Sequence, residues 1–296
     1  MNNLLANRVA IVTGAGRGLG RSHALAMAKE GARVAVSDLD PEAARQTCED
    51  IQRAGGEAVW SRTDVQQLGE VEEMVSRVIE RWGQVDILLN NAGILRDRTF
   101  AKADLPDFRL VLDVHLMGSV NCTRAVWLTM KERGYGRVIF TTSSSGLYGN
   151  YGQAAYSAAK MGLVGLMQTL ALEGSRYGIH VNCIAPSAAT QMTDPLFQPD
   201  DLLVLDPSRV SPAVVALASE KAPNKCIVLA GGGSFKLAEI TMTQGIYLAD
   251  DELDAATVLA QWDRIADRSG AMFPSTGFEQ YKFEVARARE QAPNHE

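Results

Sequence analysis

Three side chains that could transfer a proton lie close together in this sequence. Tyr156 and Lys160 are four residues apart, and Ser143 lies thirteen residues before the tyrosine. On a helix, a spacing of four residues places the phenol and the ammonium on one face. A nearby ammonium stabilises phenolate and so lowers the pKa of a phenol from its ordinary value of about 10. The pair therefore predicts a general acid or base near neutral pH, although a Tyr-x-x-x-Lys pair alone also occurs by chance on helix surfaces.

A glycine-rich segment near the start of the chain has the spacing of a dinucleotide-binding turn. It reads Thr13-Gly-Ala-Gly-Arg-Gly-Leu-Gly20, after a β-branched run at 9–13 and before a helical pattern. Glycine lets the backbone turn sharply and approach a pyrophosphate, which then meets the partial positive charge of the helix N-terminus. A glycine-rich loop without a ligand is the alternative, but the position between a strand and a helix favours a nucleotide. We expect cofactor contacts from Gly14, Arg17, Gly18, Leu19 and Gly20.

The charges beside this turn favour opposite cofactors. Asp38 ends the second expected strand, where a carboxylate can accept hydrogen bonds from the adenosine ribose and repel a 2′-phosphate. Arg17, within the turn, could instead attract that phosphate. Because the carboxylate would lie directly against the 2′ position, whereas the arginine has a longer reach, we predict NAD rather than NADP as the cofactor.

Two further strand ends could contact the cofactor. Asp64 and Val65 follow the third expected strand and could bracket an adenine, and Asp64 could equally cap the next helix. Asn91, Ala92 and Gly93 follow the fourth expected strand, at the carboxyl edge where doubly wound sheets bind ligands. Asparagine and glycine also form ordinary turns after strands, so both a binding and a purely structural role are open here.

Short β-branched runs alternate with longer helical patterns along most of the chain. Strands are expected at 9–13, 33–37, 58–61, 85–89, 137–142, 179–184 and 226–229, and helices at 19–30, 41–55, 71–82, 108–133, 153–177 and 212–219. This alternation predicts an α/β fold, a doubly wound (Rossmann) seven-stranded parallel sheet with helices on both faces. We expect residues 1–233 to form a dinucleotide-binding and catalytic domain. Residues 234–296 are expected to form a helical C-terminal extension packed on the same domain.

Composition argues against several classes of protein. The formal net charge is −6 without a concentrated Lys/Arg run, which argues against a nucleic-acid partner. No apolar run approaches the length of a membrane span, and the four cysteines and four histidines lack metal-ligand spacing. Scattered cysteines are typical of a reducing compartment, and the C-terminal Pro293-Asn-His-Glu296 is unlike a peroxisomal address. We therefore expect a cytoplasmic protein without a metal.

In their order and spacing, these motifs closely resemble the short-chain dehydrogenase/reductase family over roughly residues 5–230: the glycine turn, Asn90-Asn-Ala-Gly93, Ser143 and Tyr156-x-x-x-Lys160. The resemblance implies that Tyr156 exchanges a proton with the substrate oxygen. It implies that Lys160 lowers the pKa of the tyrosine and holds the nicotinamide ribose, and that Ser143 orients the substrate. The two serines that follow are rival hydroxyls, and the spacing to Tyr156 favours Ser143. A hydride would pass between the substrate and the nicotinamide.

Two positions depart from the family's usual pattern. His115 stands where the family usually has an asparagine that supports a proton relay, and it could carry the same water-mediated relay or only fill space. Ser187 replaces a glycine in the nicotinamide-binding loop, where Thr190 or Thr193 would contact the carboxamide. Both departures, with the segment 143–156, resemble the (3R)-hydroxyacyl-CoA dehydrogenase region of the multifunctional enzymes of peroxisomal β-oxidation. That subgroup uses NAD and also accepts some hydroxysteroids.

The leading functional prediction is an NAD-dependent oxidoreductase that interconverts a secondary alcohol and a ketone. Its substrate would be a small molecule or an acyl-CoA, most simply a 3-hydroxyacyl-CoA or a hydroxysteroid-like compound. One alternative is an NADPH-dependent 3-oxoacyl reductase of fatty-acid synthesis, against which Asp38 argues; the other is a non-catalytic NAD-sensing protein, against which the proton-transfer residues argue. Residues 188–209 are expected to form a lid over the substrate. Apolar helices at 108–130 and 154–172 predict a homodimer or homotetramer.

Overall fold

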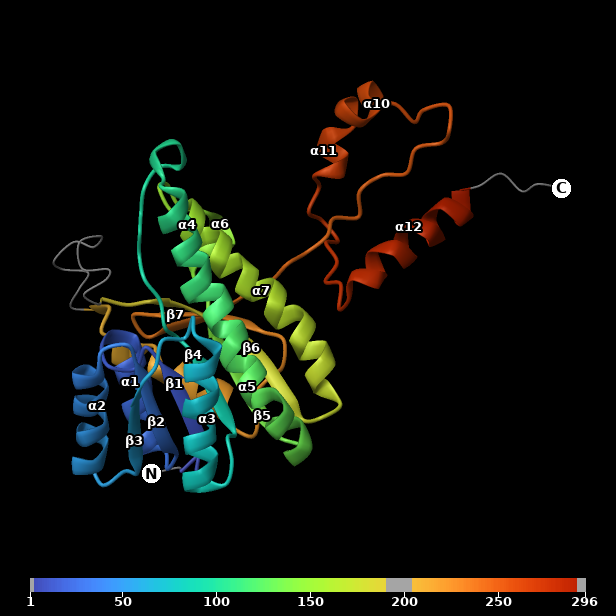
Figure 1. The fold of residues 1–296 in the computed structure, drawn as a ribbon. Helices are drawn as coiled ribbons and strands as arrows, with labels where there is room; N and C mark the ends of the chain where they lie inside the picture. The colour runs from blue at the N-terminus through green and yellow to red at the C-terminus, as the bar shows by residue number, and fades with distance from the viewer. Residues whose placement is uncertain (1–2, 190–203, 292–296) are drawn as a thin grey trace. The chain divides into compact units, whose positions relative to one another are not determined.

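The alternating strands and helices assemble into one sheet (Figure 1). The computed structural model describes residues 3–189 and 204–291. The strand order is β3-β2-β1-β4-β5-β6-β7-β8, and the strands are parallel except for β8, which is antiparallel to β7. The strands are β1 (Val9–Thr13), β2 (Arg33–Asp38), β3 (Ala58–Arg62), β4 (Ile87–Asn90), β5 (Gly136–Thr141), β6 (Ile179–Ser187), β7 (Ile227–Gly231) and β8 (Ser234–Ala238).

The described sheet has eight strands, whereas the sequence pattern predicted seven. The additional strand, β8, comes from residues that the sequence analysis assigned to the extension. Gly232 and Gly233 both have positive φ and reverse the chain after β7, so that Gly231 pairs with Ser234 in a hairpin. A hairpin needs only a two-residue turn. The alternation of strands and helices on which the prediction rested therefore gives no signal for β8.

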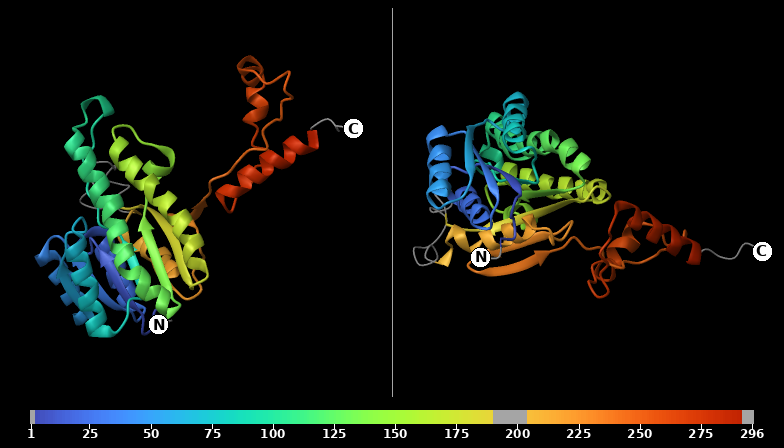
Figure 2. Two further views of the ribbon diagram at one scale, coloured as in Figure 1. Left: turned by 45° about the vertical axis from the view of Figure 1, so that its right-hand side comes forward. Right: turned by 90° about the horizontal axis from the view of Figure 1, so that it is seen from below.

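Helices cover both faces of the sheet (Figures 1 and 2). Apolar side chains of α1, α2 and α9 pack on one face, and those of α3, α5 and α7 pack on the other. The α-helices among the residues described before β8 are α1 (Gly18–Lys29), α2 (Pro41–Arg53), α3 (Leu68–Trp82), α4 (Leu105–Leu112), α5 (Gly118–Arg133), α6 (Ser144–Tyr148), α7 (Ala154–Ser175) and α9 (Ser211–Ala218). The doubly wound class predicted from the sequence is confirmed.

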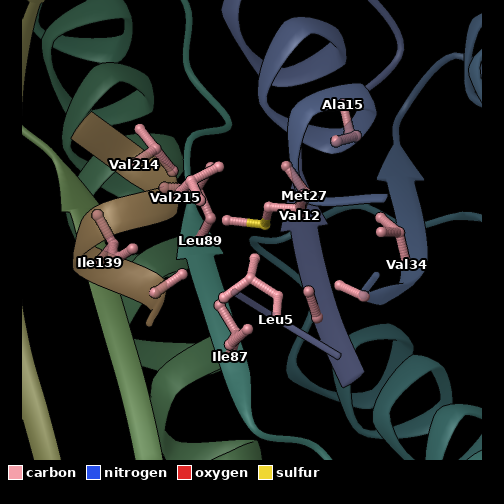
Figure 3. Packing of buried hydrophobic residues seen from close by; sticks show 14 of the residues in the cluster. Leu5, Val12, Ala15, Met27, Val34, Ile87, Leu89, Ile139, Val214 and Val215 are labelled. Carbon is pink, nitrogen blue, oxygen red and sulfur yellow. The ribbon is translucent and has the colours of Figure 1, made fainter. Parts of the chain in front are cut away.

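Each face of the sheet buries its own apolar cluster. Figure 3 shows the cluster that contains Val12 of β1, Leu89 of β4, Met27 of α1 and Val214 of α9, all of which are fully buried. Burying one such side chain contributes roughly 1.5–3 kcal/mol. Because this cluster joins β1 to β4, it fixes the two strands whose carboxyl ends carry the candidate cofactor residues.

The chain changes direction across the sheet between β1 and β4. It first moves outward through β2 and β3, and it then returns to place β4 on the other side of β1. Val12 is in register with Leu89, while Thr13 is in register with Ser37. Such a reversal leaves a crevice at the carboxyl ends of the two diverging strands, and open α/β sheets bind ligands there. The glycine turn and the segment after Asn90 both begin at this edge.

The long helix predicted at 108–133 is interrupted. A π-helical turn, η2 (Asp113–Met117), separates α4 from α5, and the amide of Gly118 donates to the carbonyl of Asp113. A π turn inserts an extra residue into the α-helical ladder and is found mostly at functional sites. Its third residue is His115, which sequence analysis singled out.

Residues 239–296 form a separate compact unit. Its described helices are α10 (Ala255–Ala260), α11 (Trp262–Ile265) and α12 (Gly277–Gln291). A β-bridge between Met242 and Met272 closes a loop within it. Between residues 239 and 290 no side chain is fully buried. The packing of this extension on the catalytic domain stays a prediction. Throughout the described ranges, no helix combines the length and the apolar character needed to cross a membrane.

Candidate active site

The glycine turn leaves no space for side chains at two of its predicted positions. Gly14 has φ +60, a conformation that side chains disfavour. A Cβ atom at Gly20 would lie 2.0 Å from the carbonyl oxygen of Gly14 and 2.6 Å from Nδ2 of Asn91. The first turn of α1 is therefore pressed against the end of β1. Contacts from Gly14, Gly18, Leu19 and Gly20 to an anion at this helix N-terminus stay a prediction.

Asn91 bridges the two strands that border the crevice. Its Nδ2 donates to the carbonyl oxygens of Thr13 and Gly14, both at 3.1 Å. The hydroxyl of Thr13 accepts the backbone N–H groups of Asn91 (3.0 Å) and Ala92 (3.1 Å). The structural role that sequence analysis left open for this segment is thus present. Asn91 holds the glycine turn in place while its own backbone lies along the crevice.

The carboxylate of Asp38 is held against the glycine turn. Its Oδ2 accepts the amide of Gly16 at 2.8 Å, and its Oδ1 accepts the amide of Asp40 at 3.0 Å. Arg17 does not contact Asp38 and instead forms an ion pair with Asp40. Sequence analysis missed both Gly16 and Asp40. The capping position of Asp40 before α2 was the available signal, since its Oδ1 accepts the amides of Glu42 and Ala43.

The loop after β3 is held from two sides. Oδ1 of Asp64 accepts the amide of Gln66 at 3.0 Å, so this carboxylate caps a turn just before α3. The carbonyl of Val65 accepts Nδ2 of Asn121 at 3.0 Å. Asn121 lies on α5 and was not predicted from the sequence. The arrangement places Asp64 and Val65 at the carboxyl edge of the sheet, where a role toward an adenine stays a prediction.

Tyr156, Lys160 and Ser143 come together at the starts of two helices. Ser143 precedes α6 and accepts the amide of Ser145 at 3.1 Å, and its side chain is near enough to Tyr156 to lower the pKa of the phenol. Tyr156 lies in the first turn of α7, and the Lys160 ammonium lies 5.4 Å from the centre of its ring. Of the three candidate serines, Ser143 is the one that acts on the pKa of the tyrosine. Ser144 is exposed.

The electrostatics of the pair differ from the sequence prediction. Burial raises the pKa of Tyr156, the hydrogen bond from Ser143 lowers it, and the negative charge of Asp97 raises it further. Lys160 is only 3% exposed, and burial lowers its own pKa to about 7. Its Nζ donates to the carbonyl of Thr141 at 2.5 Å. Because the ammonium is desolvated and directed at this carbonyl, it does not by itself produce the lowered tyrosine pKa that the spacing predicted.

His115 packs against the tyrosine from the π turn. The two rings are 5.2 Å apart, edge to face. Nε2 of His115 lies 3.0 Å from the amide nitrogen and 2.8 Å from the carbonyl oxygen of Ile94. Its Nδ1 is buried and has no hydrogen-bond partner among the described residues. Burial and the charge of Lys160 lower the pKa of His115 to about 3, so the ring is neutral.

Gly93 has a steric reason to be glycine. A Cβ atom there would lie 2.3 Å from Cε1 of His115. The imidazole thus occupies space above the loop that follows β4. Thr190 and Thr193 lie outside the described residues, as does most of the predicted lid at 188–209. Ser187, the second departure from the family pattern, ends β6 and packs against Gly231.

The chain belongs to the short-chain dehydrogenase family. Residues 8–201 match the sequence pattern of that family, and the Rossmann-like sheet agrees with it. It is therefore an NAD(P)-dependent oxidoreductase of the short-chain type.

Several relatives of this chain carry more specific names than the family. The chain is 40% identical to the peroxisomal hydratase-dehydrogenase-epimerase of Saccharomyces cerevisiae, over 98% of this chain and 34% of that protein. It is 41% identical to a short-chain type dehydrogenase/reductase of Mycobacterium tuberculosis, over 90% of this chain and 96% of that protein. Among solved structures, the full-length peroxisomal multifunctional enzyme type 2 of Drosophila melanogaster matches with a TM-score of 0.82 at 36% identity, over 96% of this chain and 50% of that chain. The chain thus spans half or less of these multifunctional relatives.

A solved structure with bound ligands also matches. It is a 7α-hydroxysteroid dehydrogenase complexed with NADH and 7-oxoglycochenodeoxycholic acid, with a TM-score of 0.73 at 28% identity, over 79% of this chain and 96% of that one.

The expectation of a cytoplasmic protein is wrong by these comparisons. Relatives from yeast, mouse, Drosophila melanogaster and Dictyostelium discoideum are all named as peroxisomal enzymes. The scattered cysteines indicated a reducing compartment, but several compartments of a cell are reducing. The positions of buried cysteines therefore carry no information about where the protein is targeted.

We predict that Gly93→Ala lowers the free energy of unfolding by about 1–3 kcal/mol, because the added methyl group collides with the His115 ring. Gly93→Ala/His115→Ala should recover part of this loss, since the smaller side chain vacates the space. Thermal unfolding followed by circular dichroism measures both. The control is Gly69→Ala in α3, where an added Cβ meets nothing within 4 Å. A Gly93→Ala protein as stable as this control would contradict the packing argument.

Proposed function

We propose that this chain interconverts a secondary alcohol and a ketone, with Tyr156 as the group that exchanges the proton. The observation that carries the proposal is the convergence of Ser143 on Tyr156, where the serine side chain lowers the pKa of the phenol, with Lys160 one helical turn further along α7. Two neighbouring hydroxyls can both bond the same substrate oxygen. A non-catalytic NAD sensor would not need such a pair. Tyr156 is only partly buried, so a substrate can reach it.

The residues at the crevice fit a dinucleotide. A Cβ atom at Gly14 would meet the backbone of Ala92, and one at Gly20 would meet the carbonyl of Gly14 and the side chain of Asn91. The glycines thus let the turn pack tightly against the ends of β1 and β4, which supports a dinucleotide-binding turn. When bound, the nicotinamide ring supplies the hydride acceptor or donor. Lys160 is proposed to hold the nicotinamide ribose. Thr190 is proposed to contact the carboxamide.

In the oxidation direction, Ser143 and Tyr156 would hold the alcohol oxygen, and the phenolate form of Tyr156 would take its proton. In reduction, the phenol would return a proton to the ketone oxygen. Burial lowers the pKa of Lys160 to about 7, which supports a role for this group in the passage of the proton near neutral pH. We further propose that the unpartnered Nδ1 of His115 binds a water that passes the proton onward. Its Nε2 is already engaged by Ile94.

The proposed substrate is a 3-hydroxyacyl-CoA or a hydroxysteroid-like alcohol. Support comes from the 40% identity to a peroxisomal hydratase-dehydrogenase-epimerase and from the fold match to a hydroxysteroid dehydrogenase. A 3-oxoacyl reductase is the second candidate, because a relative so named in Synechocystis is 40% identical over 65% of this chain. The two candidate functions differ in the proposed cofactor, which is NAD for the dehydrogenase and NADPH for the 3-oxoacyl reductase.

NAD is the proposed cofactor rather than NADP. Both oxygens of Asp38 are fixed by backbone amides beside the glycine turn, where a carboxylate repels a 2′-phosphate. Arg17, which could attract that phosphate, is paired with Asp40. The NADH bound by the matching hydroxysteroid dehydrogenase is consistent with this preference.

Tyr156→Phe should reduce kcat by about 10²–10⁴-fold, the usual contribution of a general acid or base. The assay is NAD reduction with 3-hydroxyacyl-CoA esters, hydroxysteroids and simple secondary alcohols. Tyr177→Phe, just beyond the end of the same helix, is the matched control and should keep normal turnover. Undiminished turnover by the Tyr156→Phe enzyme would refute the proton-transfer role.

Asp38→Asn should raise the ratio of kcat/KM for NADP to that for NAD by about tenfold or more, because a repulsion of about 1.4 kcal/mol is removed. Glu72→Gln changes the same charge on the exposed side of α3 and should leave the ratio unchanged. Steady-state kinetics with both cofactors measure it. If the Asp38→Asn enzyme kept the original preference, Asp38 would not be the residue that selects the cofactor.

The homo-oligomer also stays a proposal. Leu128 on α5 and Met161 and Leu172 on α7 expose 66%, 40% and 48% of their surface, which supports association through these two helices. We expect light scattering to give a dimer or tetramer. A protein that stays monomeric at micromolar concentration would contradict the proposal.

A further inference from the structure

The loop that follows β4 is fastened to the beginning of α7. The amide of Arg98 donates to the carbonyl of Gly152 at 2.9 Å. The residues next to these two also pair, since Nε2 of Gln153 donates to Oδ2 of Asp97 at 2.6 Å. A hydrogen bond this short to a carboxylate is charge-assisted and stronger than a neutral one. The two loops therefore meet as one unit, three residues before Tyr156.

Gln153 has no freedom to leave this contact. Its side chain is 6% exposed, and its Oε1 accepts Nδ2 of Asn150 at 3.1 Å. The amide is thus held at both ends, and its orientation is fixed. A buried amide that directs an N–H at an acidic side chain fixes the position of that carboxylate. The carboxylate of Asp97, which belongs to an exposed loop, is in this way held in one position.

This position of the Asp97 carboxylate is near Tyr156. Asp97, Gln153 and Tyr156 line one cavity of about 10 Å³, which is room for a single water molecule. Arg96, Arg98, Asp104 and Asp107 are the other charged residues that line it. Arg96 pairs with Asp107 at 3.6 Å, so these two charges compensate one another. His115 and Lys160 lie 5.2 and 5.4 Å from the centre of the Tyr156 ring. The histidine is neutral, and the lysine donates to the carbonyl of Thr141.

We propose that Asp97, anchored by Gln153, is a positioning residue that opposes the loss of the proton from Tyr156. The inference rests on the function proposed above for Tyr156. A fixed negative charge beside a phenol destabilises the phenolate through Coulomb repulsion. The elevated pKa of Tyr156, to which Asp97 contributes, is in accord with this.

The two directions of the reaction need different protonation forms of Tyr156. In oxidation, the alcohol O–H bond breaks and its proton forms the phenol O–H bond, and a bound nicotinamide would accept the hydride from the carbon. This step needs the phenolate. In reduction, the phenol O–H bond breaks and its proton forms the O–H bond of the alcohol, and a bound reduced nicotinamide would supply the hydride for the new C–H bond. Asp97 keeps Tyr156 in the form that reduction uses, and it moves the onset of oxidation to higher pH.

The decisive substitution is Asp97→Asn, which removes the charge but keeps an oxygen that can accept the Gln153 amide. The rising limb of kcat/KM against pH for alcohol oxidation should move to lower pH by about 0.5, a modest shift because the carboxylate is partly exposed and screened. Asp97→Glu keeps the charge and should retain the original limb. Asp104→Asn removes a charge from the same loop and cavity without a contact to Gln153, and it should not shift the limb.

A second measurement needs no turnover. The ultraviolet absorbance change on forming tyrosinate is recorded against pH for each protein and for the same protein carrying Tyr156→Phe, and the difference isolates Tyr156. Asp97→Asn should move this titration to lower pH by the same amount as the kinetic limb. Gln153→Leu should move it part of the way, because the carboxylate is released from its anchor.

An Asp97→Asn titration identical to that of the unaltered protein would overturn the inference, and so would an equal shift in Asp104→Asn. An unshifted Gln153→Leu titration would overturn the anchoring by Gln153. If no alcohol on the panel is oxidised, the proposed function fails, while the spectroscopic titration still decides the role of Asp97.

Discussion

The crevice of this protein depends on the way the ends of β1 and β4 are joined by one side chain. Beyond their last paired residues the two strands diverge, and their backbone groups need new partners. Asn91 supplies them, through Nδ2 to the carbonyls of Thr13 and Gly14, and the hydroxyl of Thr13 completes the set. With both strand ends fixed, the glycine turn on one side and the Ile94–His115 contact on the other are held at the same edge of the sheet.

Burial then sets the acid–base character of the site. Lys160 is almost fully enclosed and points at a neutral carbonyl, so its charged form is disfavoured and its pKa falls to about 7. The same burial keeps His115 neutral and raises the pKa of Tyr156. In such surroundings a nearby charge or hydroxyl can move the pKa of the phenol. The pKa of the tyrosine therefore depends on its burial, on Ser143 and on Asp97.

Much of the fold could be predicted because each element has its own local signal. β-branched runs, the glycine turn and the proline at the start of α2 mark strands and helix ends without reference to the rest of the chain. Three features escaped prediction. The hairpin strand β8 lacks a helical crossover, α6 is only five residues long, and the π turn at His115 has the composition of an ordinary helix. In each case the local pattern is compatible with more than one backbone path, and tertiary packing selects between them.

The sequence by itself determined which chemical groups reach the carboxyl edge of the sheet, because strand and helix periodicity fix where each segment ends. It identified Tyr156, Lys160, Ser143, Asp38 and His115 as the groups to consider. Only the tertiary structure decided what each of them touches. Arg17 pairs with Asp40, His115 bonds Ile94, and Asp97 meets Gln153, partners that are 23, 21 and 56 residues apart. No local pattern encodes such contacts, because they arise only when the sheet brings distant loops to one edge.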